Sequence, residues 1–167
     1  MSKLEVREIG PISGETEVRL ADGATAVGFG GGKILQVIQK VYSTQVATAS
    51  TTYIPSGLKT SITPSSTSSK ILVIAKITAF YNSGGGGDPT GGSIALFREG
   101  ASIVDSCSQM YSSNNAIKGD AGINFLDSPS STSSLNYEIR FKKEWGGNQF
   151  CHDNDTPSTI ILMEVLA

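Results

Sequence analysis

The stretch Leu135-Asn-Tyr-Glu-Ile-Arg-Phe-Lys-Lys143 alternates apolar and polar residues along its whole length. The apolar positions are Leu135, Tyr137, Ile139 and Phe141, and the polar ones are Asn136, Glu138, Arg140 and Lys142. Successive side chains of an extended strand point to opposite faces of a sheet. This period of two therefore predicts a strand with a buried face and a solvated face, as in an antiparallel sheet.

The segment 70–81, Lys-Ile-Leu-Val-Ile-Ala-Lys-Ile-Thr-Ala-Phe-Tyr, is apolar on both faces for most of its length. Such a run predicts a central strand. One of its faces would be covered by a second sheet, and the other by a neighbouring element or another subunit.

Further strand patterns recur along the chain, whereas amphipathic helix patterns are nearly absent. Strands are predicted at 34–42, 51–54, 58–62, 93–98, 102–105, 123–126, 149–151 and 159–166. The hexapeptide Pro-Ser-Ser-Thr-Ser-Ser occurs at 64–69 and again at 129–134, and each copy predicts a polar turn between sequential strands. The sequence thus predicts an all-β antiparallel sandwich of jelly-roll type.

A glycine-rich hinge divides the chain, because four of the five residues at 28–32 are glycine. The residues before it are too few to form a core of their own. We therefore predict an N-terminal arm at 1–32 for attachment or oligomerisation, and a β-sandwich domain at 33–167. The arm would lie on the main domain, pair with other subunits or dock on a larger partner.

The chain has few charges: 17% of its residues are charged and the formal net charge is −2. The 13 basic residues are scattered, and nucleic-acid binding draws its affinity from clustered Lys and Arg, so no nucleic-acid partner is predicted. The N-terminus lacks the apolar core of a signal peptide, and no stretch is long and apolar enough for a membrane span. Ser, Thr, Asn and Gly supply the polar surface, as in extracellular β structures and virion proteins.

An ordered series of short motifs resembles a structural domain of bacteriophage virion proteins, especially tail-fibre proteins of cyanophages and other marine phages. The motifs are Gly32-Lys-Ile-Leu-Gln-Val-Ile-Gln39, Ser61-Ile-Thr-Pro-Ser-Ser-Thr-Ser-Ser-Lys-Ile-Leu-Val73, Phe97-Arg-Glu-Gly100, Phe125-Leu-Asp-Ser-Pro129 and Ser158-Thr-Ile-Ile-Leu-Met-Glu-Val165. The resemblance implies a virion component that is assembled in the host cytoplasm, forms a homotrimer and contacts other virion proteins through residues 1–32. It implies a tail fibre or fibre-like appendage, or alternatively a capsid decoration or cement protein.

The sequence contains no convincing catalytic or metal-binding motif. His152 is the only histidine and lies in Cys151-His-Asp-Asn-Asp155, but no nucleophile elbow accompanies it. The same loop could offer metal ligands, yet it lacks the spacing of an EF-hand. A polysaccharide-degrading enzyme would need paired carboxylates, and the candidates Asp88, Asp120, Asp127, Asp153 and Asp155 are all predicted in loops. We therefore predict no enzymatic activity, no catalytic residues, no metal and no cofactor.

A host-surface glycan is the one ligand that the sequence favours. Trp145, the only tryptophan, lies in the turn-like segment Glu144-Trp-Gly-Gly-Asn148, where flanking glycines allow a sugar ring to approach the indole. Tyr111, in a loop rich in Ser and Asn, is the second candidate. The alternative is that Trp145 caps the end of the sandwich or packs at a subunit interface.

Two cysteines, Cys107 and Cys151, lie 44 positions apart and do not form a CxxC pair. They are either free buried thiols or a single bridge between neighbouring strands, and we expect free thiols.

Overall fold

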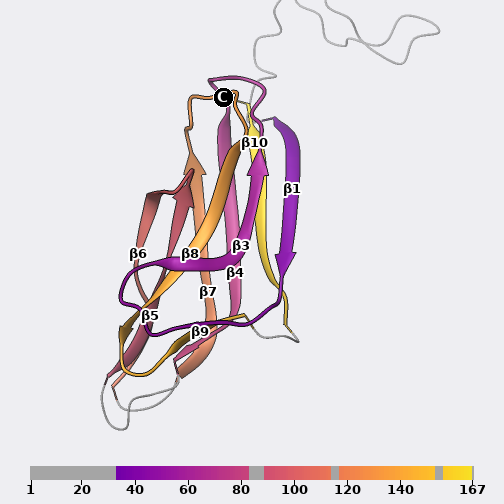
Figure 1. Ribbon diagram of the computed structural model, residues 1–167. Coiled ribbons are helices and arrows are strands. Elements are labelled where there is room, and N and C mark those ends of the chain that lie inside the picture. Colours follow the sequence, from indigo (N-terminus) through magenta and orange to yellow (C-terminus); the bar gives the residue numbers. More distant parts are fainter. Residues whose placement is uncertain (1–32, 83–88, 114–116, 153–155, 167) are drawn as a thin grey trace, which may run out of the picture. The chain divides into compact units, whose positions relative to one another are not determined.

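A computed structural model describes residues 33–82, 89–113, 117–152 and 156–166, except for the side chains of residues 79, 106–110 and 117 (Figure 1). These residues belong to one compact unit, Gly32–Ala167. The predicted arm at 1–32 lies outside the described residues. Within the described ranges no helix is long and apolar enough to cross a membrane.

The first sheet contains four rows of strands. β1 (Ile34–Tyr42) pairs with β10 (Ser158–Val165), β10 pairs with β4 (Lys70–Asn82), and β4 pairs with β7 (Ile117–Asp127). Two short strands extend the first two rows: β2 (Val46–Thr48) pairs with β9 (Gln149–Cys151), and β9 also pairs with the end of β4. All of these pairs are antiparallel.

The second sheet has the order β3 (Ile54–Ile62), β8 (Leu135–Trp145), β5 (Thr90–Arg98) and β6 (Ala101–Ser112). All of its pairs are antiparallel as well. The stretch that predicted a half-buried strand, 135–143, forms most of the central strand β8.

The pairing is nested along the chain. When β1 and β2 count as one interrupted row and β9 and β10 as another, the first row pairs with the last, β3 with β8, β4 with β7 and β5 with β6. An antiparallel ribbon rolled up in this way is a jelly roll, the two-sheet solution of eight-stranded Greek-key proteins. The predicted all-β sandwich of jelly-roll type is confirmed.

The two copies of the repeated hexapeptide are equivalent connections between the sheets. The copy at 64–69 leads from β3 to β4, and the copy at 129–134 leads from β7 to β8. Ile62 is in register with Leu135, and Ile71 is in register with Asp127. The two turns therefore join the same pair of strand ladders at the same end of the sandwich.

The core lies between the two sheets and is made of inward-facing side chains from both. Phe80 of β4 contacts Phe141 of β8 edge-to-face, with ring centroids 6.5 Å apart. The residues that are fully buried or nearly so include Leu58, Ile71, Val73, Ile77, Ile94, Leu96, Ile139, Ile160 and Leu162. Close packing of these branched and aromatic side chains holds the two layers together.

Three details differ from the predicted strands. The segments predicted at 51–54 and 58–62 form one strand, β3, with a register irregularity between Pro55 and Lys59. Gly57 lies in this bulge with φ +88°, and a side chain there would clash with the Tyr42 ring, so glycine is required. The strand β2 was not predicted, and β6 and β7 are much longer than predicted because their polar residues continue the ladders.

Candidate functional site

The outer face of the first sheet carries a row of apolar side chains that crosses all four strands. Val37, Met163, Leu72 and Leu126 are aligned in register from β1 through β10 and β4 to β7. Val37 is 56% exposed and Leu126 is 48% exposed, and the other two are half-buried. We call these four residues the apolar row.

Two more apolar side chains lie beside the apolar row. Ile161 of β10 and Ile74 of β4 are in register in the next row, flanked by exposed Gln39 and Asn124. One row further, Lys76 forms an ion pair with Asp120, 2.8 Å between Nζ and Oδ2. The face is therefore apolar in its centre and polar at its margin.

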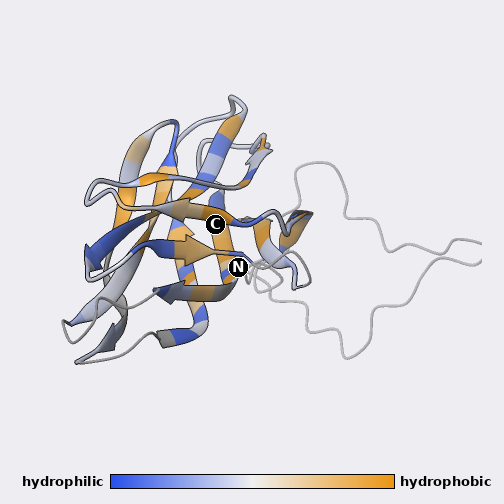
Figure 2. Cartoon of the chain, turned by 60° about the horizontal axis from the view of Figure 1, so that its bottom comes forward, coloured by the Kyte–Doolittle hydropathy of each residue, from blue (hydrophilic) through white to orange (hydrophobic). Residues whose placement is uncertain are grey.

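This arrangement differs from the normal scatter of single apolar residues on a surface. Along much of β4 and β10 the residues on both faces are apolar. Figure 2 shows hydrophobic segments on several strands of the chain. The second sheet covers only one of the two faces. The expected neighbour on the other face of 70–81 is not supplied by the described part of this chain.

The two predicted glycan-binding residues, Trp145 and Tyr111, are brought together by the fold. Their rings meet edge-to-face, with centroids 5.8 Å apart and planes at 87°. Trp145 is 45% exposed and Tyr111 is 56% exposed. The prediction that they lie in loops was wrong: Trp145 is the last residue of β8, and Tyr111 lies in β6, because both ladders continue to this end of the sheet.

Gly91 of β5 lies between the two aromatic residues, in register with both. Because it has no side chain, the two rings can meet above the middle strand. Asn82, which is buried, donates to the carbonyl oxygens of Trp145 at 3.0 Å and Gly147 at 3.3 Å. Gly146 follows with φ +74° and packs against Thr90, where a side chain would clash. The backbone that presents Trp145 is thus fixed on both sides of the residue.

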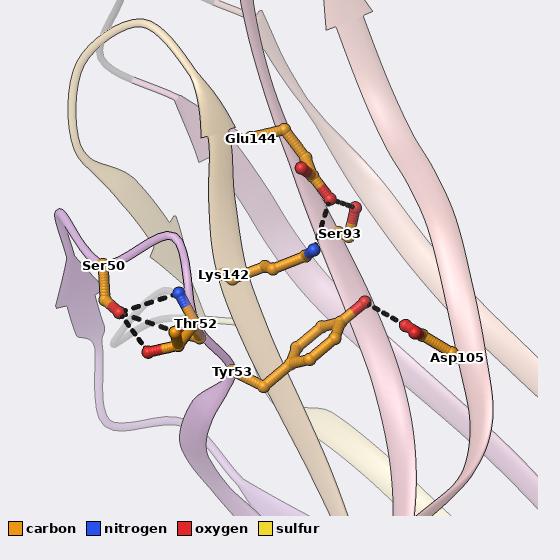
Figure 3. Close-up of polar contacts among 7 residues, drawn as sticks. All are labelled: Ser50, Thr52, Tyr53, Ser93, Asp105, Lys142 and Glu144. Atoms are coloured by element: carbon orange, nitrogen blue, oxygen red, sulfur yellow. Dashed lines mark hydrogen bonds and ion pairs between the residues drawn. The ribbon is translucent and has the colours of Figure 1, made fainter.

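A polar network lies next along the outer face of the second sheet (Figure 3). Tyr53 donates a hydrogen bond of 2.7 Å to Asp105 Oδ1, and Lys142 Nζ lies 4.8 Å from the centroid of the Tyr53 ring. Lys142 also pairs with Glu144 at 3.1 Å, and Ser93 donates to the same carboxylate. Burial, together with the Asp105 carboxylate, raises the pKa of the Tyr53 hydroxyl. The hydroxyl therefore stays protonated and donates.

His152 is fully buried and has a structural environment. Its Nε2 donates to the carbonyl oxygen of Ser56 at 2.8 Å, so its Nδ1, 2.7 Å from Ser158 Oγ, is the acceptor in the neutral ring. Ser158 Oγ in turn accepts from the backbone N–H of Thr78. Burial lowers the pKa of His152, although the Ser56 carbonyl opposes the shift. Since both side chains are buried, this Ser–His contact is closed to a substrate.

The predicted carboxylate candidates do not form a catalytic pair in the described part of the chain. Asp120 and Asp127 lie in β7 and not in loops, which corrects the prediction. Asp127 accepts hydrogen bonds of 2.6 Å from both Arg98 and Tyr137, and it is buried. Asp88, Asp153 and Asp155 lie outside the described residues. Among the described residues, no group of three or more His, Cys, Asp and Glu side chains is placed to hold a metal ion.

Cys151 is a free, buried thiol, and the side chain of Cys107 lies outside the described residues. Burial raises the pKa of the Cys151 thiol. The Cys151 thiol is therefore an unreactive core residue, as expected for a small buried hydrophobe.

Glu164 is the one buried carboxylate on the inner side of β10. It accepts hydrogen bonds from the backbone N–H and the hydroxyl of Ser65, each 2.6 Å, and from Gln36 Nε2, also 2.6 Å. Burial alone would raise the pKa of Glu164, but these hydrogen bonds outweigh it and lower the pKa to about 2. Glu164 thereby ties the first interlayer turn to β1 and β10.

We expect acid to destabilise the fold in two steps. His152 must lose its proton to be buried, so stability falls as the pH drops through the ordinary histidine value of 6.5. Glu164 must be ionised, so a further loss of stability follows as the pH falls from 4.5 to about 2. Urea denaturation at a series of pH values measures both steps. The variant Glu164→Gln should lack the lower step, and a midpoint that stays constant from pH 7 to 3 would refute this account.

No family model matches the chain, and no curated protein sequence matches it either. Two of the solved structures that it resembles are viral. The VP2 subviral particle of infectious bursal disease virus aligns with a TM-score of 0.36 and 13% identity, over 79% of this chain and 37% of that chain. The Gx strain of the same virus aligns with a TM-score of 0.36 and 13% identity, over 90% and 41% of the two chains. This chain spans about two-fifths of the length of those viral chains.

Proposed function

We propose that this chain is a structural subunit of a bacteriophage virion: a homotrimer that forms a tail fibre or fibre-like appendage. The observation that carries the proposal is the apolar row with Ile74 and Ile161 beside it, on a sheet face that nothing in the described chain covers. Burying such a face is worth about 25 cal/mol for each Å² of apolar area. Self-association supplies that burial in every copy at once.

A structural role also fits the use that the chain makes of its ionisable side chains. Asp127, Glu164 and His152 are held by hydrogen bonds within the core or at its margin. Asp120 pairs with Lys76. These groups stabilise strand ladders and interlayer turns, and they are not gathered at one site. This supports a protein whose function is assembly and contact and not catalysis.

The resemblance of the sequence motifs supports three parts of the proposal. These are the location in a phage virion, the trimeric state, and the use of residues 1–32 to contact other virion proteins. The jelly-roll topology is also the fold of many viral capsid proteins. It therefore favours one alternative, a capsid decoration or cement protein in which the arm clamps neighbouring capsid subunits. A tail fibre and a capsid decoration protein are both parts of a virion. The fold alone does not select between these two roles.

Removal of residues 1–32 should leave the sandwich folded and abolish its incorporation into particles. The physical reason is that the compact unit starts at Gly32, so the strands keep all their described partners. Circular dichroism of the truncated chain measures folding, and mass spectrometry of purified particles measures incorporation. A truncated chain that does not fold would refute the domain boundary, and a folded one that is still incorporated would refute the attachment role of the arm.

A further inference from the structure

We propose that Trp145 and Tyr111 form a binding platform for a pyranose ring of a neutral oligosaccharide. Two large aromatic side chains from different strands, both about half exposed, contact each other on the surface of a jelly roll. An edge-to-face pair leaves at least one face of each ring uncovered by its partner. The C–H face of a sugar ring is apolar and flat enough to stack on such a surface.

The platform is preorganised by its surroundings. Gly91 removes the side chain that would separate the rings, and it is itself buried beneath them. Asn82 bonds the carbonyl oxygens of Gly91 and Trp145, which fixes β5 and β8 relative to each other. A surface held in this way loses little conformational entropy when a ligand binds.

Glu144, a polar group suited to sugar hydroxyls, directly precedes Trp145. It is the extra residue of β8 where the β5–β8 ladder shifts register between Gly91 and Gly92. Its carboxylate is already oriented by Ser93 and by Lys142 at 3.1 Å (Figure 3). A carboxylate offers about four acceptor positions, so it can accept from hydroxyl groups in addition to these partners. An apolar stacking surface beside paired acceptors and donors is the combination that a carbohydrate requires.

The same charges argue against a nucleic acid as the ligand. Bases also stack on aromatic rings, but such sites combine the rings with a positively charged groove for the phosphates. Here the charged residues that precede Trp145 in β8 are Lys142, Lys143 and Glu144, with Lys142 paired to Glu144, and the whole chain has a formal net charge of −2. These mixed charges do not make a positively charged groove, and a neutral sugar does not need one.

The single tryptophan of the chain makes the test direct, because Trp145 is its only source of indole fluorescence. The full-length protein is titrated with maltohexaose, cellohexaose and N-acetylchitohexaose at concentrations up to the millimolar range. We expect a saturable change in Trp145 fluorescence with at least one of them. Tyr111→Ala should weaken that binding at least tenfold, and Tyr111→Phe, which keeps the ring, should restore it.

Leu166→Ala, which changes an exposed apolar residue after β10 and outside the apolar row, is the matched control and should bind as the wild type does. Thermal melting should be the same for the wild type, Tyr111→Ala and Leu166→Ala, because both side chains are well exposed. The proposal is overturned if none of the three oligosaccharides gives a saturable change, or if Tyr111→Ala binds as well as the wild type. A single-stranded oligonucleotide that saturates in place of the sugars would also overturn it. The inference does not rest on the proposed assembly, because binding and oligomeric state are measured separately.

Discussion

Replacing Phe141 with Ala should lower the free energy of unfolding by about 3–5 kcal/mol, which is the range measured for deletion of a buried phenylalanine. Phe141 is fully buried in β8, the second strand of its sheet, and is in register with Ile54 and Ile94 on either side. Its ring also contacts Phe80 of the opposite sheet. The loss would remove a large part of a total stability of about 5–15 kcal/mol.

Urea denaturation measures this loss as a lower midpoint with an unchanged slope. Trp145→Ala is the matched control, since it removes an aromatic ring from the same strand at a position that is 45% exposed. We expect the control to change stability far less. A loss below about 1 kcal/mol for Phe141→Ala would mean that the two layers are not held together as described.

The fold class could be predicted because it depends on local patterns. The period of two in 135–143 predicted which face of β8 is buried, and Leu135, Tyr137, Ile139 and Phe141 are all buried. The two-faced run at 70–81 became the most highly paired strand, with β10, β9 and β7 as neighbours. The equivalence of the two Ser-rich turns could also be predicted, because the same hexapeptide occurs at both places in the sequence.

Other features depend on tertiary pairing and were missed. Glu138 was predicted to face water, but it is buried and accepts a hydrogen bond of 2.7 Å from Arg140. The period of two does not reveal this contact, since it places Glu138 among the polar positions of the strand. Glu138 can be buried because the charge of Arg140 compensates for the loss of water. The burial of His152 was not predicted either, since its partners Ser56 and Ser158 lie far from each other in the sequence.

The candidate aromatic site shows a similar division. Trp145 and Tyr111 were singled out from their composition and neighbours, but as separate loop residues. Their contact depends on the ladders of β5 and on a register shift between Gly91 and Gly92. Such a shift in register cannot be predicted from the alternation of apolar and polar residues. Gly91, which permits the contact, lies inside β5.

The apolar row leads to the second large expected effect. The double variant Val37→Glu with Leu126→Glu should convert the assembled protein into a monomer. These residues are the most exposed of the row and lie on its two outer strands, so the folded chain tolerates polar replacements there. In an assembly, each carboxylate would be buried without a partner, which costs about 1–3 kcal/mol or more per group. This free-energy cost of burying the two carboxylates is repeated in every subunit of the assembly.

A matched control places the same two charges on the other sheet. Ser61→Glu with Ser102→Glu changes two exposed residues on β3 and β6, the outer strands of that sheet. This variant has the same net charge as the first. We expect it to assemble as the wild type does, which separates the effect of position from that of charge.

Light scattering of the purified full-length chain at micromolar concentration is the most direct test that the first sheet is an assembly surface. We expect the wild type and the control to have a mass three times 17.5 kDa, and the Val37→Glu, Leu126→Glu variant to have a mass of 17.5 kDa with an unchanged circular dichroism spectrum. A wild type that is monodisperse at 17.5 kDa would contradict the account. So would a double variant that assembles as well as the wild type.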